Sequence, residues 1–254
     1  MNRLSGKVIV VAGGGGIGSE LARRYAAEGA SIVLGDIDAA AAQTVVDEIV
    51  AAGGIATATE LDGGDEASIY AIVDLACATY GGLDGFHANY ASFADGAIAA
   101  SVLDMPMDVY DEVMRVNARG HLLCTRAALP KMIERGGGVM LYTSSGSAYV
   151  PMPIRPAYAM SKSAIHALMR TVAIKHGPDG IRANVIAPGI IMHEKLEANA
   201  SPGLKEWAFG RNAVKARLGR PADIAATGAM LMSDEGAYIT GQVLSIDGGS
   251  SMRQ

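Results

Sequence analysis

The sequence has few cysteines, few aromatic residues and no long apolar run. Its two cysteines, Cys77 and Cys124, fall far apart in helical patterns, which excludes a disulfide-built scaffold and predicts two small buried apolar side chains. The five histidines show no ligand spacing, so we expect no structural zinc site and no metal. No apolar run approaches the roughly 18 residues that span a bilayer, and residues 1–7 show no signal-peptide core. We therefore expect a cytoplasmic protein without a membrane partner.

An excess of positive charge is also missing. The chain carries 21 basic and 26 acidic residues, for a net charge of −5. Half of its residues are apolar and 19% are charged, which is typical of a globular protein and does not favour a nucleic-acid partner. A length of 254 residues suits one large α/β domain.

Apolar runs of strand length alternate with helical patterns along the whole chain. Strands are predicted at 7–11, 31–34, 55–60, 85–89, 139–143, 182–187 and 242–246. Helices are predicted at 19–28, 39–50, 66–80, 106–135, 157–176 and 221–232. This alternation predicts a single-domain Rossmann fold over residues 1–254, with a doubly wound parallel sheet of about seven strands flanked by helices.

Glycines follow the first predicted strand directly, at Gly13, Gly14, Gly15, Gly16 and Gly18. A strand, a glycine loop and a helix form an arrangement that binds phosphates, because backbone can approach the ligand and a helix N-terminus offers free N–H groups. Tight turns also use glycine clusters. The loop therefore indicates a nucleotide site only together with other signals.

An acidic residue, Asp36, ends the second predicted strand eighteen residues beyond Gly18. Dinucleotide-binding folds place an acid there to accept hydrogen bonds from the adenosine ribose. Ile37 follows and no Lys or Arg lies nearby, so the sequence favours NAD over NADP. The alternative is a cap for the next helix, a role for which Asp38 is better placed.

A hydroxyl, a phenol and an ammonium occur together in residues 145–162. Tyr158 and Lys162 are four residues apart, so a helix places them on one face. A positive charge beside a phenol favours the phenolate, which predicts that Lys162 lowers the pKa of Tyr158 and that Tyr158 transfers protons. Ser145 precedes Tyr158 by thirteen residues, across a loop with three prolines, and its hydroxyl can return beside the phenol. The alternative is an exposed pair on a helix.

Polar and turn residues follow several predicted strands and should meet at one edge of the sheet. They are Asp36, Asp62, Asn89, Ser145 and Pro188. Ligands of doubly wound sheets bind beyond the carboxyl ends of the strands. This convergence predicts that Tyr158 and Lys162 belong to a ligand site.

With these motifs in order, the chain resembles the short-chain dehydrogenase/reductase family from Gly6 to Gly249. The matching segments are the glycine loop, the strand that ends in Asp36, Ser145 with Tyr158 and Lys162, IRANVIAPG, RLGRPADIA and YITGQVLSIDGG. The resemblance implies that Tyr158 is the acid/base, that Ser145 binds the substrate oxygen, and that Lys162 also binds the nicotinamide ribose. It implies that Asn117 lies at a backbone kink and continues a proton relay; the alternative is a solvent-facing helix residue.

The resemblance also implies a set of NAD contacts. These are Gly13, Gly16, Ile17 and Gly18 at the pyrophosphate, Asp36 at the adenosine ribose, Leu61 and Asp62 near adenine, and Asn89, Tyr158, Lys162, Pro188, Gly189 and Ile191 toward the nicotinamide end. It further implies a homotetramer built on helices 106–135 and 157–176 and the carboxyl-terminal segment.

Three positions depart from the family pattern. The loop is one residue short if Ala12 takes the place of the family's threonine, or else Ala12 stands where the first glycine should be; in both cases the threonine hydroxyl is missing. Tyr90 replaces a small residue and presses either toward the cofactor or into the neighbouring helix. His193 stands where a threonine often contacts the nicotinamide, and it makes that contact, turns to substrate or lies on a mobile loop.

Residues 191–217 show no strand pattern and are predicted to form a lid over the pocket. Apolar side chains there and before the catalytic helix would enclose a ring or an alkyl chain: Met152, Ile154, Met192, Leu196, Trp207 and Phe209. Together with Ser145 and Tyr158, residues Met152, Met192 and Trp207 form the predicted substrate set. Packing of the lid on the core is the alternative role for each apolar residue.

The predicted function is NAD-dependent hydride transfer between the nicotinamide and a secondary alcohol or ketone, with a cyclic, aromatic or otherwise apolar substrate. A 3-oxoacyl-type ketoreductase is one alternative. A family member that uses tightly held NAD for epimerisation or dehydration and a non-catalytic NAD sensor are two others.

Overall fold

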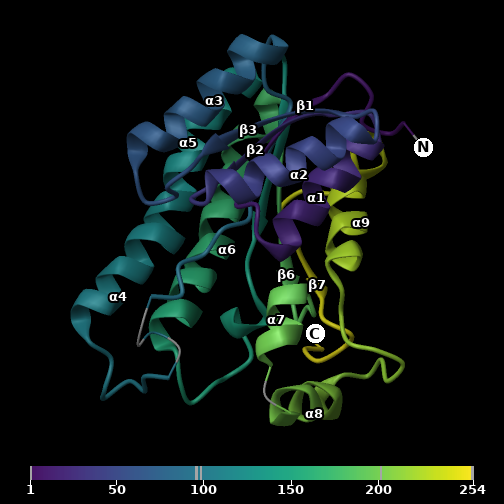
Figure 1. The fold of residues 1–254 in the computed structure, drawn as a ribbon. Helices are drawn as coiled ribbons and strands as arrows, with labels where there is room; N and C mark the ends of the chain where they lie inside the picture. Colours follow the sequence, from purple (N-terminus) through teal and green to yellow (C-terminus); the bar gives the residue numbers. More distant parts are fainter. Residues whose placement is uncertain (1, 95–96, 98, 201, 253–254) are drawn as a thin grey trace.

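The structure, a computed structural model, describes residues 2–94, 97, 99–200 and 202–252. A parallel sheet of seven strands in the order β3-β2-β1-β4-β5-β6-β7 forms its centre (Figure 1). The strands are β1 (Val8–Ala12), β2 (Ser31–Asp36), β3 (Ile55–Glu60), β4 (Gly85–Ala88), β5 (Gly138–Thr143), β6 (Ile181–Pro188) and β7 (Val243–Ile246). The order runs outward from β1 in both directions, which confirms the predicted doubly wound Rossmann fold.

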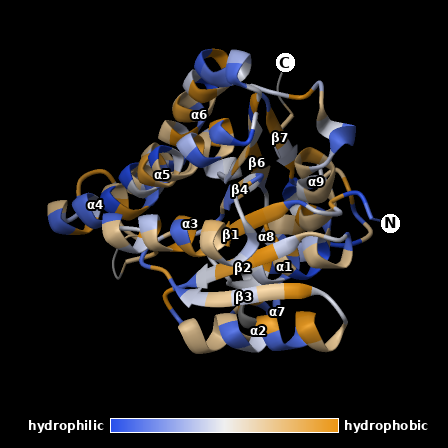
Figure 2. Cartoon of the chain, turned by 90° about the horizontal axis from the view of Figure 1, so that it is seen from above, coloured by the Kyte–Doolittle hydropathy of each residue, from blue (hydrophilic) through white to orange (hydrophobic). Residues whose placement is uncertain are grey.

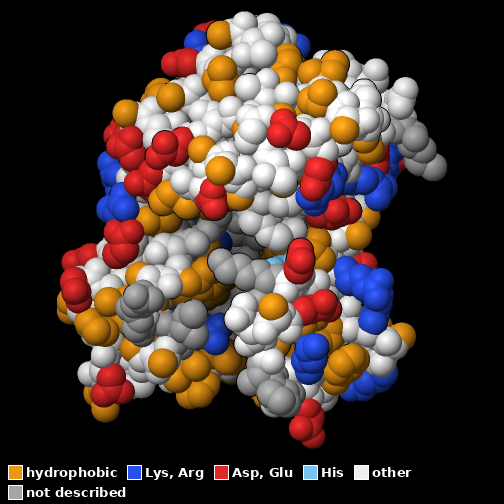
Figure 3. Space-filling view, viewed as in Figure 1, with side chains coloured by type: hydrophobic (Ala, Val, Ile, Leu, Met, Phe, Trp, Pro, Cys, Tyr) orange, Lys and Arg blue, Asp and Glu red, His pale blue; other side chains and the backbone are white. Residues whose placement is uncertain are grey.

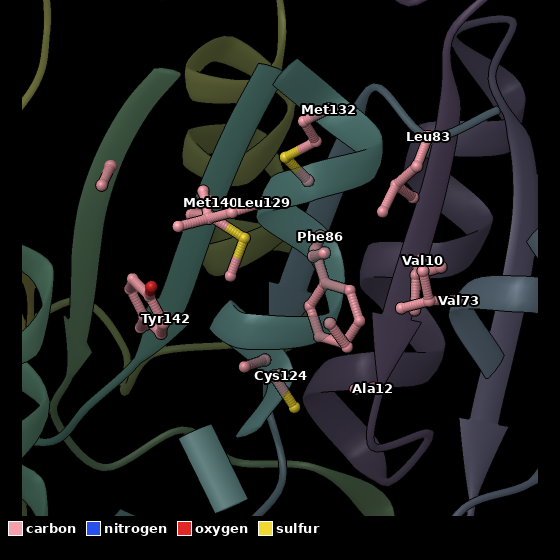
Figure 4. Packing of buried hydrophobic residues seen from close by; sticks show 14 of the residues in the cluster. Val10, Ala12, Val73, Leu83, Phe86, Cys124, Leu129, Met132, Met140 and Tyr142 are labelled. Carbon is pink, nitrogen blue, oxygen red and sulfur yellow. The ribbon is translucent and has the colours of Figure 1, made fainter. Parts of the chain in front are cut away.

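Helices cover both faces of the sheet. One face packs against α1 (Gly16–Ala27), α2 (Ala39–Ala51) and α9 (Pro221–Met232), and the other against α3 (Glu66–Tyr80), α5 (Gly120–Glu134) and α6 (Pro156–His176). All five residues of β1 are buried, as expected for a parallel strand between two helix layers. Figure 2 shows the apolar strand residues between these layers, and Figure 4 shows Phe86 and Met140 packed under Met132 of α5.

The helix predicted at 106–135 has an irregular centre. It consists of α4 (Met107–Met114), a π-helical turn over Arg115–Arg119, and α5. At the start of α5, a Cβ added at Gly120 would lie 2.0 Å from the Gly63 carbonyl oxygen. The helix therefore passes very close to the loop after β3, and the wider turn accommodates one additional residue.

The predicted lid contains two helices, α7 (Glu194–Asn199) and α8 (Pro202–Arg211). Both lie beyond the carboxyl end of β6 (Figure 1). No helix in the described part of the chain is long and apolar enough to cross a membrane.

Candidate active site

The carboxyl ends of the strands bring the predicted site residues to one edge. Asp36 and Pro188 end β2 and β6, while Asp62, Asn89 and Ser145 come just after β3, β4 and β5. The molecule is hollowed below this edge, between the helices around the sheet and the lid (Figure 3). The predicted convergence is therefore present.

Tyr158 and Lys162 lie one turn apart on α6, which begins with Pro156. A proline suits the first turn because its missing N–H has no partner there. The Lys162 Nζ lies 5.7 Å from the centre of the Tyr158 ring. The pair shares one face of the helix as the spacing predicts.

Lys162 is buried in the protein, with 1% of its surface exposed. Its Nζ donates a hydrogen bond to the Thr143 carbonyl oxygen at 2.9 Å. Burial disfavours the charged form and lowers the pKa of Lys162 to about 7. The ammonium is thus poised to lose its proton near neutral pH.

The pKa of Tyr158 shifts in the direction opposite to the sequence prediction. Part of the side chain is exposed, but protein atoms crowd the hydroxyl and this burial raises the pKa. A hydrogen bond with Ser145 and the positive charge of Arg155 act in the lowering direction and are smaller. Lys162 does not produce the expected net lowering, because its own charge is destabilised by burial.

Ser145 comes two residues after β5 and caps a short 3₁₀ helix over Gly146–Ala148. Its Oγ accepts a hydrogen bond from the Ser147 N–H at 3.1 Å and is hydrogen-bonded to the Tyr158 hydroxyl. This cap fixes the Ser145 side chain. The hydroxyl does return beside the phenol.

Asn117 lies within the π-helical turn and is fully buried, so the solvent-facing alternative is wrong. Its Oδ1 accepts from the Ser92 N–H at 2.6 Å, and its Nδ2 donates to the Ser92 carbonyl oxygen at 3.3 Å. Nδ2 also lies 3.4 Å from the Ser161 Oγ on α6. Asn117 therefore joins the kinked helix to the loop after β4 and to α6.

The glycine loop is tightly folded, and α1 begins at Gly16 rather than at the predicted Ser19. Gly13 has a φ of +100°, a conformation that side chains rarely adopt. A Cβ added at Gly18 would lie 1.7 Å from the Gly13 carbonyl oxygen. The loop therefore exposes backbone at the helix N-terminus, which fits a pyrophosphate; Ile17 packs below it against the core.

Acidic groups flank the glycine loop on the side of β2 and β3. The Asp36 carboxylate accepts from the Gly14 N–H at 2.6 Å and from the Asp38 N–H at 3.0 Å. Asp38 is the cap of α2, as predicted, since it accepts from the Ala41 N–H. Asp62 accepts from the Gly64 N–H at 2.7 Å, and Leu61 is buried beside it.

The chain after β6 returns to the glycine loop. Ile191 is buried and forms a parallel bridge with Gly219, while Gly189 packs closely on Asp247. The His193 ring lies over Gly16, where an added Cβ would be 2.5 Å from His193 Cγ. Of the three alternatives for His193, the structure shows none directly; it places the ring on the predicted pyrophosphate loop.

Tyr90 points into the neighbouring helix, which decides between its two alternatives. Its hydroxyl lies 3.2 Å from the Cys124 Sγ, and its ring centre lies 4.8 Å from that of His121. Cys124 is buried, whereas Cys77 is partly exposed. Tyr90 thus fills the space between the loop after β4 and α5.

The sequence prediction missed Phe93, whose ring stacks on Tyr158 with centres 5.2 Å apart and planes at 28°. Phe93 is 55% exposed. An aromatic residue in the loop just after Asn89, on the edge where ligands bind, was the available signal. The stacked pair forms an apolar wall beside the Tyr158 hydroxyl.

Of the predicted substrate residues in the lid, Met192 is buried and Trp207 is 42% exposed. Met192 is buried against Ala208 and Leu218, and the Trp207 ring lies 5.2 Å from the Arg211 guanidinium. Met152 is partly buried before α6. Their contact with substrate stays a prediction.

A cavity of about 220 Å³ lies between the lid and the segment before α9. Met192, Phe209 and Leu218 line it together with charged side chains. Ser145, Tyr158 and Lys162 do not line this cavity. We therefore place the candidate site at the strand ends beside α6, where Ser145, Tyr158 and Lys162 lie together.

Comparisons with known proteins agree with this geometry. The profile of the family described as Enoyl-(Acyl carrier protein) reductase matches residues 11–251. A probable short-chain type dehydrogenase/reductase of Bradyrhizobium diazoefficiens is 39% identical over 98% of this chain and 89% of its own length. The (+)-cis,trans-nepetalactol synthase of Nepeta racemosa is 37% identical over 97% and 94%. The structure of 7α-hydroxysteroid dehydrogenase complexed with NADH and 7-oxo glycochenodeoxycholic acid is 34% identical over 98% and 96%, with a TM-score of 0.91.

Proposed function

Because this chain belongs to the short-chain dehydrogenase/reductase family, we propose that it is an NAD-dependent dehydrogenase that transfers a hydride between the nicotinamide and a secondary alcohol or ketone. One observation carries the proposal: the Tyr158 hydroxyl is hydrogen-bonded to Ser145 while the Lys162 Nζ lies on the same side of α6, 5.7 Å from the ring centre. Binding alone does not require a phenol held between a hydroxyl and a cation.

The proton-transfer groups have separate tasks. Tyr158 exchanges a proton with the substrate oxygen, and Ser145 holds that oxygen beside the phenol by a hydrogen bond. When Lys162 is charged, it favours loss of the phenol proton. Asn117 holds the loop after β4 against α6 through Ser92 and Ser161, which fixes the position of Phe93 in this loop relative to Tyr158 on α6.

The glycine loop and its neighbours fit NAD. Gly16, Ile17 and Gly18 present the start of α1 to a pyrophosphate, and Asp36 stands where the adenosine ribose is bound. Ile37 beside it is 73% exposed and uncharged, so a 2′-phosphate there would meet the Asp36 carboxylate and an apolar side chain. Leu61, Asp62, Asn89, Pro188, Gly189 and Ile191 are the proposed remaining contacts. The bound nicotinamide supplies the acceptor or donor of the hydride.

We propose an apolar, cyclic substrate. The exposed Phe93 ring stacked on Tyr158 offers a flat apolar surface next to the reacting oxygen. The similar 7α-hydroxysteroid dehydrogenase, whose structure contains a steroid ligand, supports this class. The net charge of −5 does not favour an acidic carrier protein, and hence a 3-oxoacyl-type ketoreductase, as the alternative.

A second candidate function is non-redox chemistry with NAD held in the site. The similarity to the nepetalactol synthase favours it. Retention of NAD through purification, with product formed and no net change in NADH, distinguishes this function from dehydrogenation.

We also propose a homotetramer. Apolar side chains are exposed on α4, α5 and the loop before them: Val102, Leu103, Met107 and Leu122. Ile174 at the end of α6 and Tyr238 before β7 are exposed on a second surface. Two separate apolar surfaces support two different contacts between copies, as a tetramer requires.

The decisive test is NADH formation on a panel of cyclic secondary alcohols that includes a hydroxysteroid and a monoterpene alcohol, with NAD and NADP in parallel. We expect activity with NAD and a fall in kcat of about 10²–10⁴-fold in Tyr158→Phe, with NAD affinity retained. Tyr80→Phe is the matched control, since it also removes a hydrogen-bonded phenol hydroxyl, here from Thr57, away from the site. Unchanged turnover in Tyr158→Phe would refute the mechanism.

A further inference from the structure

A line of hydrogen bonds crosses the interior of the protein from α1 to the glycine loop. The Tyr25 hydroxyl lies 2.8 Å from His87 Nδ1, and His87 Nε2 lies 3.0 Å from Thr143 Oγ1. Thr143 Oγ1 donates to Asn89 Oδ1 at 2.8 Å, and Asn89 Nδ2 donates to the Gly13 carbonyl oxygen at 3.1 Å. The line therefore joins α1, β4 and β5 to the loop that is proposed to bind pyrophosphate.

The line is buried for most of its length. Tyr25 and His87 are fully buried, and Thr143 is 6% exposed. Apolar side chains alternate with His87 along β4, including Phe86 and Ala88, which are both fully buried. A buried polar pair is costly unless it is fully bonded, and each of these groups has its partner.

The direction of each bond follows from the hydroxyl of Thr143. Its hydrogen goes to Asn89, so its oxygen accepts from His87, and Nε2 of His87 carries the hydrogen. Nδ1 then accepts from the Tyr25 hydroxyl. Burial lowers the pKa of His87 to about 3, so the ring stays neutral and the direction of the line does not change near neutral pH.

The orientation of the Asn89 amide agrees with this direction, because the Gly13 carbonyl oxygen can only accept a hydrogen bond. The amide oxygen faces Thr143 and the amide nitrogen faces the Gly13 carbonyl. The amide also touches the other end of the loop, since a Cβ added at Gly18 would lie 2.9 Å from Asn89 Nδ2. Ala12, at the start of the loop, has no side-chain hydroxyl that could hold the loop by a hydrogen bond. Asn89 is thus held from the interior of the sheet.

We propose that His87 and Tyr25 are positioning residues for NAD binding, which act through Thr143 and Asn89 to hold the glycine loop in its binding conformation. The inference rests on the proposed NAD-dependent function. The inference concerns the affinity for NAD rather than the rate of hydride transfer. Lys162 donates to the backbone carbonyl of Thr143, and this contact remains when Tyr25 or His87 is substituted.

The first experiment compares two substitutions of His87 by calorimetric titration with NAD. His87→Leu removes the donor to Thr143, and we expect NAD to bind about tenfold more weakly, the value of one lost buried hydrogen bond. His87→Gln retains an N–H donor and is expected to restore most of the affinity. The kcat at saturating NAD should change less than the KM for NAD.

Tyr25→Phe tests whether Tyr25 acts through His87. We expect it to weaken NAD binding in the natural chain and to have no further effect in the His87→Leu background, because the line is already broken there. Additive losses of affinity in the double variant would show that Tyr25 acts independently, against the proposal.

Phe86→Leu is the structural control, since Phe86 precedes His87 on β4 and points to the opposite face. It should lower the melting temperature and leave the Kd for NAD unchanged. Equal weakening of NAD binding in Phe86→Leu and His87→Leu, at similar losses of melting temperature, would overturn the inference in favour of a general packing effect.

A measurement without NAD separates this inference from the proposed function. The ¹⁵N shifts of the His87 ring should show hydrogen on Nε2 and no titration across neutral pH; hydrogen on Nδ1 would contradict the line. A natural chain that binds no NAD would instead overturn the proposed function, and the positioning role with it.

Discussion

At the scale of single residues, burial decides the charge states at the centre of the site. Burial raises the pKa of Tyr158 and lowers the pKa of Lys162 to about 7. The two shifts have one cause, since a low-dielectric surrounding disfavours phenolate and ammonium alike. The proposed proton transfer therefore depends on the groups that act to lower the pKa of Tyr158, namely the hydroxyl of Ser145 and the positive charge of Arg155.

The lowered pKa of Lys162 predicts how the free energy of unfolding changes with pH. Between about pH 7 and the ordinary lysine value of 10.5, the unfolded chain holds a proton that the folded chain lacks. The free energy of unfolding of the natural chain, relative to Lys162→Met, should therefore rise by up to about 1.4 kcal/mol per pH unit across this range. It should be flat below pH 7, where both states are protonated. Urea unfolding of both proteins at several pH values checks it.

A difference between the two proteins that stays constant from pH 6 to pH 10 would contradict a depressed pKa for Lys162. Lys7→Met is the control, because Lys7 forms an exposed ion pair with Asp234 whose contribution is expected to be small.

At the scale of elements, the π-helical turn links three parts of the site through Asn117. Asn117→Ala leaves the Ser92 N–H without its acceptor. We expect a loss of about 1–3 kcal/mol of stability together with a fall in kcat, because the loop that carries Phe93 loses its anchor. Urea unfolding and steady-state kinetics measure the two effects.

Asn184→Ala is the matched control for Asn117→Ala. Asn184 is also fully buried and also bridges two backbone groups, at Ile239 and Gln242, between β6 and β7. It should cost similar stability and leave kcat nearly unchanged. Equal losses of kcat in the two variants would show that Asn117 acts through general stability.

The glycine loop offers a second comparison at this scale. Gly18→Ala places a Cβ 1.7 Å from the Gly13 carbonyl oxygen, so we expect a loss of about 3 kcal/mol or more. Gly15→Ala meets nothing within 4 Å and should cost less than about 1 kcal/mol as a change of helix cap. Thermal unfolding of the two variants compares them directly. Equal stability would mean that the loop is looser than the close approach of Gly18 to Gly13 indicates.

At the scale of the whole molecule, the exposed apolar surfaces predict assembly. Leu122→Glu on α5 and Ile174→Glu on α6 each place a charge in one proposed contact, so each should reduce the tetramer to a dimer. Light scattering measures the mass of each variant. Val50→Glu on α2 is the control, as Val50 is also apolar and more than half exposed but lies on a helix outside both surfaces. A natural chain that is monomeric contradicts the proposed assembly.

The sequence by itself determined the architecture and the place of the site. Runs such as Val8–Ala12 are apolar at every position, and only a strand covered on both faces buries such a run. The four-residue spacing of Tyr158 and Lys162 and the strand end at Asp36 are local features, so their geometry follows from helix and strand periods alone. The apolar pattern of helix 106–135 gives no sign of the π-helical turn, because one additional residue in a turn leaves the pattern unchanged; the family resemblance alone implied the backbone kink at Asn117.

Only the tertiary structure decided which distant side chains meet. The stacking of Phe93 on Tyr158, the direction of Tyr90 and the line from Tyr25 through His87 to Asn89 join residues from different elements. The sign of the pKa shift of Tyr158 was also decided there. Sequence spacing predicts neighbours within one element, whereas burial and contact between elements arise when the helices pack on the sheet, and these set the charge states and the shape of the site.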